Sequence, residues 1–316
     1  MLTICLAQLA PVWLNRAATL DKIVAAVHEA AGAGAGLIVF GETLLPGYPF
    51  WLDATGGARF NDPVQKDLFA HYHREAVSIE RGDLAPLVAA CRARGVHCVV
   101  GVLERPEDRG GNSLYCSLVY IDAGGRVRNV HRKLQPTYEE RLVWSPGDGH
   151  GLRVFDLSGF RMGGLNCWEN WMPLPRAALY GLGETLHVAI WPGNARNTEV
   201  LTRFLAREGR SYCVSVSGLM RPADVPADVP HRQLIVDNLG AVPADGGSCL
   251  AAPDGSWLIE PVTGREALTY AELDPREVVR ERQNFDVAGH YSRPDVTRLT
   301  VDRRRQRTVD YRDGEA

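Results

Sequence analysis

The chain has 316 residues, of which 45% are hydrophobic and 23% are charged, and its formal net charge is -3 at pH 7. This composition is ordinary for a globular protein with a sizeable core, and the charge does not favour a nucleic-acid partner. The length permits one large core or two domains, and one core is the simpler interpretation. The seven cysteines are scattered without CxxC pairs, which argues against a disulfide framework or thiolate zinc site and favours a reducing, cytoplasmic setting.

The N-terminal stretch "MLTICLAQLAPVW" predicts a first strand. It is unlike a signal peptide, because it has no basic lead, Gln8 interrupts its apolar run and Pro11 follows at once. No stretch approaches the roughly 20 apolar residues that a membrane span requires. We therefore expect no membrane partner.

A helix is expected next, because Leu20, Ile23 and Val27 recur at helical spacing after the potential cap Asn15. It runs out in "AGAGAG" before the strand-like run "LIVF". In a nucleotide-binding fingerprint the glycines follow a strand and open a helix, whereas these glycines end one. They are better explained by close packing of a helix end.

Beyond a long polar connection, strand-like and helix-like segments continue to alternate. Helices are expected from near Met172, where two prolines suit only a first turn, and over 197–209. "RPADVPADVP" is interpreted as a surface loop. Strands are expected at "VHCVVGVLE", "LRVFDL", "FRMGGLNC", "LHVAIW" and "YCVSVSG", at 248–250, 257–259 and 268–273, and as a hairpin in "SLYCSLVYIDAGGRVRNVHRK".

The last 30 residues differ in character from the rest. From about residue 287 the chain turns polar and basic, with acidic residues interspersed. We expect a single domain over 1–286 and a tail over 287–316 that is solvated or contacts another subunit. The interspersed acidic residues make a nucleic-acid site the less favoured interpretation.

Three reactive side chains each follow a predicted strand: Glu42 after "LIVFG", Lys133 after "VRNVHR" and Cys167 after "MGGLN". Strand ends are where functional loops converge in layered α/β folds. Taken singly, each also has a structural explanation, as a loop carboxylate, a surface charge or a core thiol. Together they offer a nucleophile, a general base for its proton, and a fixed positive charge for the developing anion.

Three segments in order carry a family resemblance: "FGETLLPGYP" (40–49), "HRKLQPTYEERLVW" (131–144) and "NCWENWMPL" (166–174). They resemble the motif blocks of the nitrilase, or carbon-nitrogen hydrolase, superfamily, and the second and third are most similar to true nitrilases. The resemblance extends over about 2–285, and "GHYSRPD" at 289–295 resembles the tail that nitrilases carry.

The resemblance implies an α/β fold, a four-layer αββα sandwich, often in dimers or larger spiral assemblies, without a cofactor or metal. It implies that Glu42 is the general base, Lys133 the electrostatic stabiliser and Cys167 the nucleophile. Glu140 matches a glutamate that positions the lysine and substrate, although a surface charge is the alternative. The backbone N–H of Trp168 matches the family's oxyanion donor.

Several aromatic residues are candidates for the pocket. Tyr48 and Trp191 are expected to approach it, although both could be core aromatics. Phe50, Trp51 and Phe60 hint at an apolar pocket or, alternatively, at a subunit interface.

The implied reaction is hydrolysis of a small organic nitrile to the carboxylic acid and ammonia, through a thioimidate and a thioester on Cys167. Aliphatic nitriles, aromatic nitriles and arylacetonitriles all remain open, as does the ratio of acid to amide. Alternatives within the superfamily are an amidase or carbamoylase and a cyanide-degrading enzyme. An alternative of another class is a non-catalytic oligomeric scaffold.

Overall fold

Two β-sheets packed face to face form the centre of the molecule in the computed structural model, which describes residues 1–310 and 312. In the first sheet, β1, β2 and β3 are parallel, with Ile4 opposite Leu37 and Leu37 opposite His97. The first sheet contains, in spatial order, β13 (Ala267–Leu273), β1 (Leu2–Gln8), β2 (Leu37–Phe40), β3 (His97–Glu104), β4 (Tyr115–Ile121) and β5 (Val127–Arg132).

The second sheet has a parallel centre as well, with Met162 opposite Leu186 and Leu186 opposite Tyr212. An additional strand, β12 (Trp257–Thr263), pairs with β11. The other strands are, in spatial order, β10 (Leu219–Met220), β11 (Ala244–Ala251), β9 (Tyr212–Ser217), β8 (Leu186–Trp191), β7 (Phe160–Asn166) and β6 (Phe155–Leu157).

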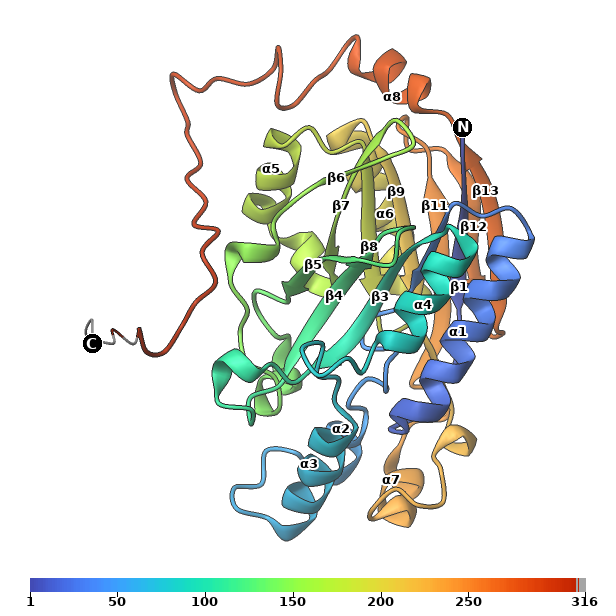
Figure 1. Cartoon of the computed structure of the whole chain (residues 1–316), viewed down its shortest axis with the longest axis vertical. Coiled ribbons are helices and arrows are strands. Elements are labelled where there is room, and N and C mark those ends of the chain that lie inside the picture. Colours follow the sequence, from blue (N-terminus) through green and yellow to red (C-terminus); the bar gives the residue numbers. More distant parts are fainter. Residues whose placement is uncertain (311, 313–316) are drawn as a thin grey trace.

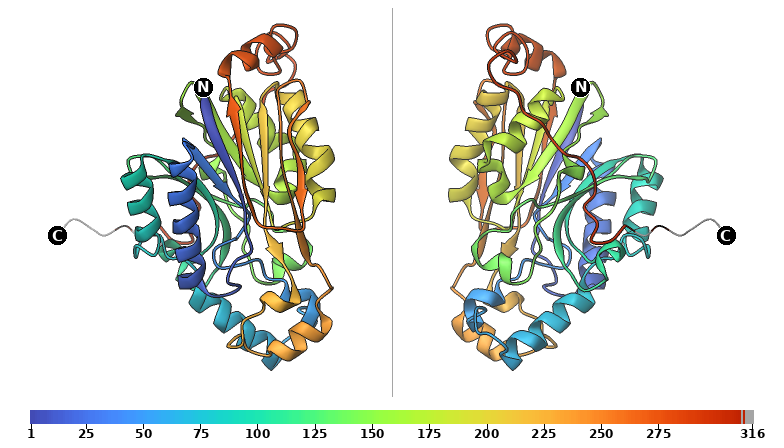
Figure 2. Two further views of the ribbon diagram at one scale, coloured as in Figure 1. Left: turned by 90° about the vertical axis from the view of Figure 1, so that its right-hand side faces the viewer. Right: turned by 90° about the vertical axis from the view of Figure 1, so that its left-hand side faces the viewer.

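Helices cover the outer face of each sheet, which gives four layers (Figure 2). α1 (Arg16–Gly32) and α4 (Ala85–Arg94) pack against the first sheet, and α5 (Pro173–Gly181) and α6 (Ala195–Gly209) against the second. Between the sheets lies a core of aliphatic side chains, among them Ile4, Leu6, Val39, Val188, Ile190 and Val214. The expected αββα sandwich is therefore confirmed.

Local signals in the sequence explain most element boundaries. Asn15 caps α1 by accepting a hydrogen bond from the Ala18 N–H at 3.0 Å. The predicted hairpin turns at 122–126 between β4 and β5. α5 begins at Pro173, but a 3-10 helix over Cys167–Trp171 comes between it and β7.

The connection expected to be long and polar is instead largely helical. It contains α2 (Trp51–Thr55), α3 (Pro63–Glu75) and α4. Together with α7 (Arg232–Asn238), α2 and α3 form a lobe at the carboxyl ends of the parallel strands (Figure 1). Few of the α3 side chains are buried, so the apolar periodicity that would reveal this helix is weak.

Beyond α8 (Pro275–Arg282), the tail runs along one side of the molecule as far as residue 310, largely in extended form (Figure 1). Most of its residues from 287 to 298 are exposed, but Val301 packs near Leu179 of α5. Arg305 donates a hydrogen bond to the buried Asp148 at 3.0 Å. Part of the tail is therefore attached to its own chain. Within the described part of the chain, no helix is long and apolar enough to cross a membrane.

Candidate active site

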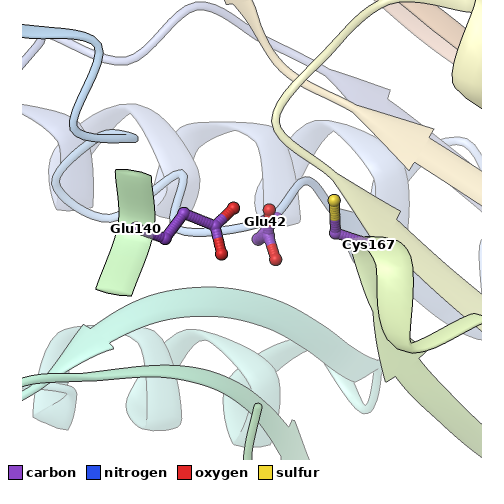
Figure 3. A group of neighbouring side chains, drawn as sticks. All are labelled: Glu42, Glu140 and Cys167. Carbon is purple, nitrogen blue, oxygen red and sulfur yellow. The ribbon is translucent and has the colours of Figure 1, made fainter. Parts of the chain in front are cut away.

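Glu42, Lys133 and Cys167 come together where β2, β5 and β7 end, with the first two on one sheet and the third on the other. Lys133 Nζ lies 2.9 Å from Glu42 Oε1, and all three side chains are buried. Figure 3 shows Glu42 between Glu140 and Cys167. One polar atom from each of these three residues lies within 4.8 Å of the others. The structure thus assembles the three strand-end residues into one cluster.

Glu140 joins the cluster from a 3-10 helix over Tyr138–Leu142. Its Oε2 accepts hydrogen bonds from Lys133 Nζ at 2.7 Å and from the Thr137 N–H at 2.6 Å. Its Oε1 accepts a hydrogen bond from the Tyr48 hydroxyl at 2.8 Å. The ammonium of Lys133 is therefore held between the carboxylates of Glu42 and Glu140, and the Tyr48 hydroxyl fixes the carboxylate of Glu140.

The backbone takes a rarely adopted conformation at three positions in or near the cluster. Thr43, Tyr138 and Cys167 have φ angles of 42°, 45° and 44°, in the left-handed region that side chains other than glycine's rarely adopt. Such strain is often concentrated at functional sites. Gly101 of β3 allows a close approach here, because a Cβ atom would lie 2.7 Å from Glu42 Cα.

The short helix that begins with Cys167 is held by its own residues Glu169 and Asn170. Glu169 accepts hydrogen bonds from the backbone N–H groups of Leu134, at 2.6 Å, and Asn166, at 2.8 Å. Asn170 donates to the carbonyl oxygen of Cys167 at 2.8 Å. Glu169 thus connects the residue after Lys133 to the residue before Cys167.

Glu169 and Asn170 were not singled out from the sequence. The available signal was the spacing of Asn166 and Glu169, which form a capping box at the start of the 3-10 helix. Their long-range partners are His131, which lies 3.1 Å from Glu169, and His187, which lies 2.7 Å from Asn170. Local sequence carries no information about these long-range partners.

Burial and neighbouring charges set the protonation states of the cluster. Burial raises the pKa of Glu42 to about 7, against the opposing effect of the Lys133 charge. Burial, and then the Glu42 carboxylate, raise the pKa of the Cys167 thiol well above its usual value. Burial alone would lower the pKa of Lys133, but the surrounding anions raise it. The resting site therefore holds a neutral thiol next to an ammonium and a titratable base.

A cavity of about 630 Å³ opens onto Cys167. Tyr48 and Trp168 line it, as expected, and the Trp168 backbone N–H is directed at the Cys167 sulfur. Arg196 and Asn197, at the start of α6, also line it, although neither was singled out individually from the sequence. The remaining walls come from Gln135, Pro136, Thr137, Tyr138, Glu139, Glu140, Arg141, Met172 and Pro192.

Trp191 lies behind the site, in the core. Its side chain is fully buried, and its indole N–H donates to Ser215 Oγ at 3.1 Å. Its carbonyl oxygen accepts from the Glu42 N–H at 3.1 Å, so it acts on the site through the backbone.

The other aromatic candidates do not line the cavity that contains Cys167. Trp51 is packed in the core of the α2/α3/α7 lobe, and Phe60 is fully exposed. Phe50 packs on the edge of the same lobe. None of the three is among the residues that line the cavity at Cys167.

A metal ion would face competition at this site. Glu42, Glu140 and Cys167 each offer a ligand atom, and these atoms are close enough to share an ion. The Lys133 ammonium, bonded to both carboxylates, already supplies a positive charge at that point. A cation would have to displace it.

Comparison with known proteins identifies the family. The profile of the carbon-nitrogen hydrolase family matches residues 3–283, which is most of the chain. This chain belongs to the carbon-nitrogen hydrolase family. It is 38% identical to "Nitrilase 2" of an unknown prokaryotic organism, over 99% of this chain and 96% of that protein. It is 35% identical to an aliphatic nitrilase of Sinorhizobium fredii, over 93% of this chain and 94% of the relative.

Solved structures of the family have the same fold. An amidase from Nesterenkonia sp. AN1, with acrylamide added at its active-site cysteine, superimposes with a TM-score of 0.67. It is 19% identical to this chain, and the match covers 92% of this chain and 99% of the amidase. A carbon-nitrogen hydrolase from Helicobacter pylori G27 superimposes with a TM-score of 0.69. It is 18% identical to this chain, and the match covers 93% of this chain and 96% of that protein. Both are similar to this chain in architecture.

Proposed function

We propose that this member of the carbon-nitrogen hydrolase family is a nitrilase, which hydrolyses an organic nitrile to the carboxylic acid and ammonia. The observation that carries the chemistry is the buried cluster in which Glu42 and Lys133 lie beside the Cys167 thiol. The preference for nitriles over amides is supported by 35–38% identity to proteins named nitrilase.

In the first step the Cys167 sulfur attacks the nitrile carbon. Because the thiol is neutral at rest, its proton must leave as the S–C bond forms, and Glu42 is placed to accept it. The nitrile nitrogen gains negative charge, is stabilised by Lys133, and takes the proton from Glu42. The product of this step is a thioimidate.

Two waters complete the turnover. The first adds to the thioimidate carbon, with Glu42 accepting one of its protons, and gives a tetrahedral intermediate that carries an amino group. Protonation of that amino group expels ammonia and leaves a thioester. The second water then releases the carboxylic acid and restores the thiol. If the tetrahedral intermediate expels sulfur instead of ammonia, the product is an amide.

The experiment that tests the proposal is a substrate panel. Aliphatic nitriles, aromatic nitriles, arylacetonitriles, the matching amides and cyanide are each supplied, and ammonia, acid and amide are measured together. We expect ammonia and acid from at least one class of nitrile. Ammonia released from amides alone would mean that the enzyme is an amidase. Ammonia released from cyanide alone would mean that it degrades cyanide.

A homo-oligomer, a dimer or larger spiral assembly, remains part of this proposal. Large apolar side chains are exposed near the outer face of the second sheet, among them Trp171, Leu174, Val200 and Phe204. Monomers rarely leave such side chains grouped in water, and interfaces are enriched in aromatic residues. Light scattering on the purified chain tests this, and a monomer at micromolar concentration would contradict it.

A further inference from the structure

Cys116, a second buried thiol, touches both Glu42 and Lys133 and has no part in the reaction described above. It lies on β4, is 1% exposed, and its Sγ donates to Glu42 Oε1 at 3.4 Å. Its carbonyl oxygen accepts a hydrogen bond from the Lys133 N–H at 2.8 Å. One residue thus contacts the side chain of the base and the backbone of the lysine.

The two carboxylate oxygens of Glu42 have different surroundings. Oε1 accepts from Lys133 Nζ and from Cys116 Sγ. Oε2 is buried and has no hydrogen-bond donor among residues 1–310 and 312. A buried oxygen without a donor is costly, and the reaction supplies donors in the Cys167 thiol and the attacking water. The two donors on Oε1 therefore leave Oε2 as the oxygen that can take a proton.

We infer that Cys116 is a positioning residue for the base: its thiol holds Oε1 of Glu42 so that Oε2 remains free to accept the proton of Cys167 or of water. The inference rests on the proposed function, because it takes Glu42 as the base. Cys116 belongs to the buried hydrophobic cluster that also contains Tyr72, Leu103 and Trp144.

Cys116 is suited to donate rather than to react. Burial raises the pKa of its thiol well above the usual value, and the Glu42 charge raises it further, so the S–H proton stays in place. An S–H group donates weakly, so the carboxylate form of Glu42 gains only modest stabilisation from it. In the described part of the chain, the charged or titratable groups that face Glu42 are Lys133, which follows β5, Glu140 from its 3-10 helix, Cys116 from β4, Cys167, which follows β7, Tyr48, and Tyr72 from α3.

Three variants test this role. Cys116→Ser keeps a donor, Cys116→Ala removes it, and Cys116→Val removes it while filling the space. Cys91→Ala, at a buried cysteine of α4, controls for loss of a thiol from the core. The readout is the rate at which a small haloacetamide alkylates Cys167, measured against pH, with the modified residue identified by mass spectrometry.

We expect the Ala and Val variants to alkylate roughly two- to fivefold more slowly, because a weak S–H donor contributes at most about 1 kcal/mol. The midpoint of their pH dependence should move to higher pH, because a donor that favours the carboxylate is gone. Cys116→Ser should restore both the alkylation rate and the midpoint of its pH dependence. Cys91→Ala should match the protein without substitutions in both quantities. If Cys116→Ala does not fold, the comparison of Ser with Val decides the question.

Unchanged alkylation in both Ala and Val variants would overturn the inference, as would a Ser variant that behaves like Val. Since alkylation needs no nitrile, this test is separate from the substrate panel. Failure of the panel with a positive alkylation result would reject nitrile hydrolysis and keep the role of Cys116. Acid from a nitrile in the panel, together with unchanged alkylation in the Ala and Val variants, would keep nitrile hydrolysis and reject the role of Cys116.

Discussion

The carboxylate of Glu169 lies 3.1 Å from Nε2 of His131, and both side chains are fully buried. Burial opposes ionisation of Glu169, but the nearby His131 and the two backbone donors from Leu134 and Asn166 lower its pKa. A buried anion thus holds the segment after Lys133 against the segment before Cys167. The distance between the nucleophile and the ammonium therefore depends on a residue that touches neither.

Replacing Glu169 by Gln should loosen this connection. Both carboxylate oxygens accept backbone N–H groups, and the amide of Gln would place its own NH₂ against one of those donors. We expect kcat to fall roughly ten- to a hundredfold, for a lost charge-assisted bond of about 1.5–3 kcal/mol. Glu260→Gln, at an exposed site on β12, is the control. Equal kinetics for the two variants would contradict this role.

The pH profile should report the titration of Glu42. Because the base must be ionised to take a proton, kcat/KM should rise with pH through about 7, where burial places the Glu42 pKa. Glu42→Gln should be nearly inactive at every pH. A profile that is flat from pH 5.5 to 8.5 in the unmodified enzyme would exclude Glu42 as the titrating base.

The same pKa predicts a stability effect of the opposite sign. A carboxyl whose pKa is higher in the folded state stabilises the fold while it is protonated. This contribution is complete below the unfolded-state pKa of about 4.3. It is lost as the pH rises through about 7. Denaturant unfolding of Glu42→Gln should therefore depend less steeply on pH over this range than that of the unmodified protein.

An α/β organisation could be predicted from the alternation of strands and helices, and the four-layer αββα arrangement could be predicted only from the resemblance of three motif segments to one family. The positions of Trp191 and Cys116 could not be predicted. Every residue of β4 and of β8 is buried, so apolar alternation does not indicate which side chains face the site. The contacts of Cys116 with Glu42 and Lys133 join three segments that only the tertiary fold brings together.

Loss of the Tyr48 hydroxyl should affect catalysis more than folding. Tyr48→Phe removes the donor to Glu140 Oε1, and Glu140 in turn holds Lys133. We expect kcat/KM to fall roughly five- to tenfold, for about 1 kcal/mol of hydrogen bonding. Tyr138→Phe, on the exposed side of the same cavity, is the matched control. A larger loss in the control would mean that the hydroxyl of Tyr48 is not what matters.

Cys167→Ala should abolish ammonia release from every nitrile and leave the fold intact, because Cys167 is, among residues 1–310 and 312, the one cysteine that lines the cavity. Cys91→Ala should retain activity, since that thiol lies in the helical layer outside the first sheet. Circular dichroism and unfolding curves check that both variants fold. Measurable turnover by folded Cys167→Ala would rule out this residue as the nucleophile.

The attachment of the tail should contribute to the free energy of unfolding. Arg305 donates to Asp148 at 3.0 Å and to the Val130 carbonyl at 3.0 Å, and its side chain is 18% exposed. Asp148 follows Gly147, whose N–H donates to the Lys133 carbonyl at 2.7 Å. Arg305→Met would remove the guanidinium partner of the buried Asp148 carboxylate, which would keep its hydrogen bonds from the N–H groups of Gln306 and His150.

We expect Arg305→Met to lower the free energy of unfolding by about 1.5–3 kcal/mol, the contribution of a hydrogen bond to a charged group. The neighbouring Arg304 pairs with Asp302, and both side chains are exposed to solvent. Arg304→Met should therefore change the free energy of unfolding by less than about 0.5 kcal/mol. Urea unfolding measures both. If the two variants have equal midpoints, the tail does not contribute to stability through Arg305, and its contacts with Asp148 are energetically neutral.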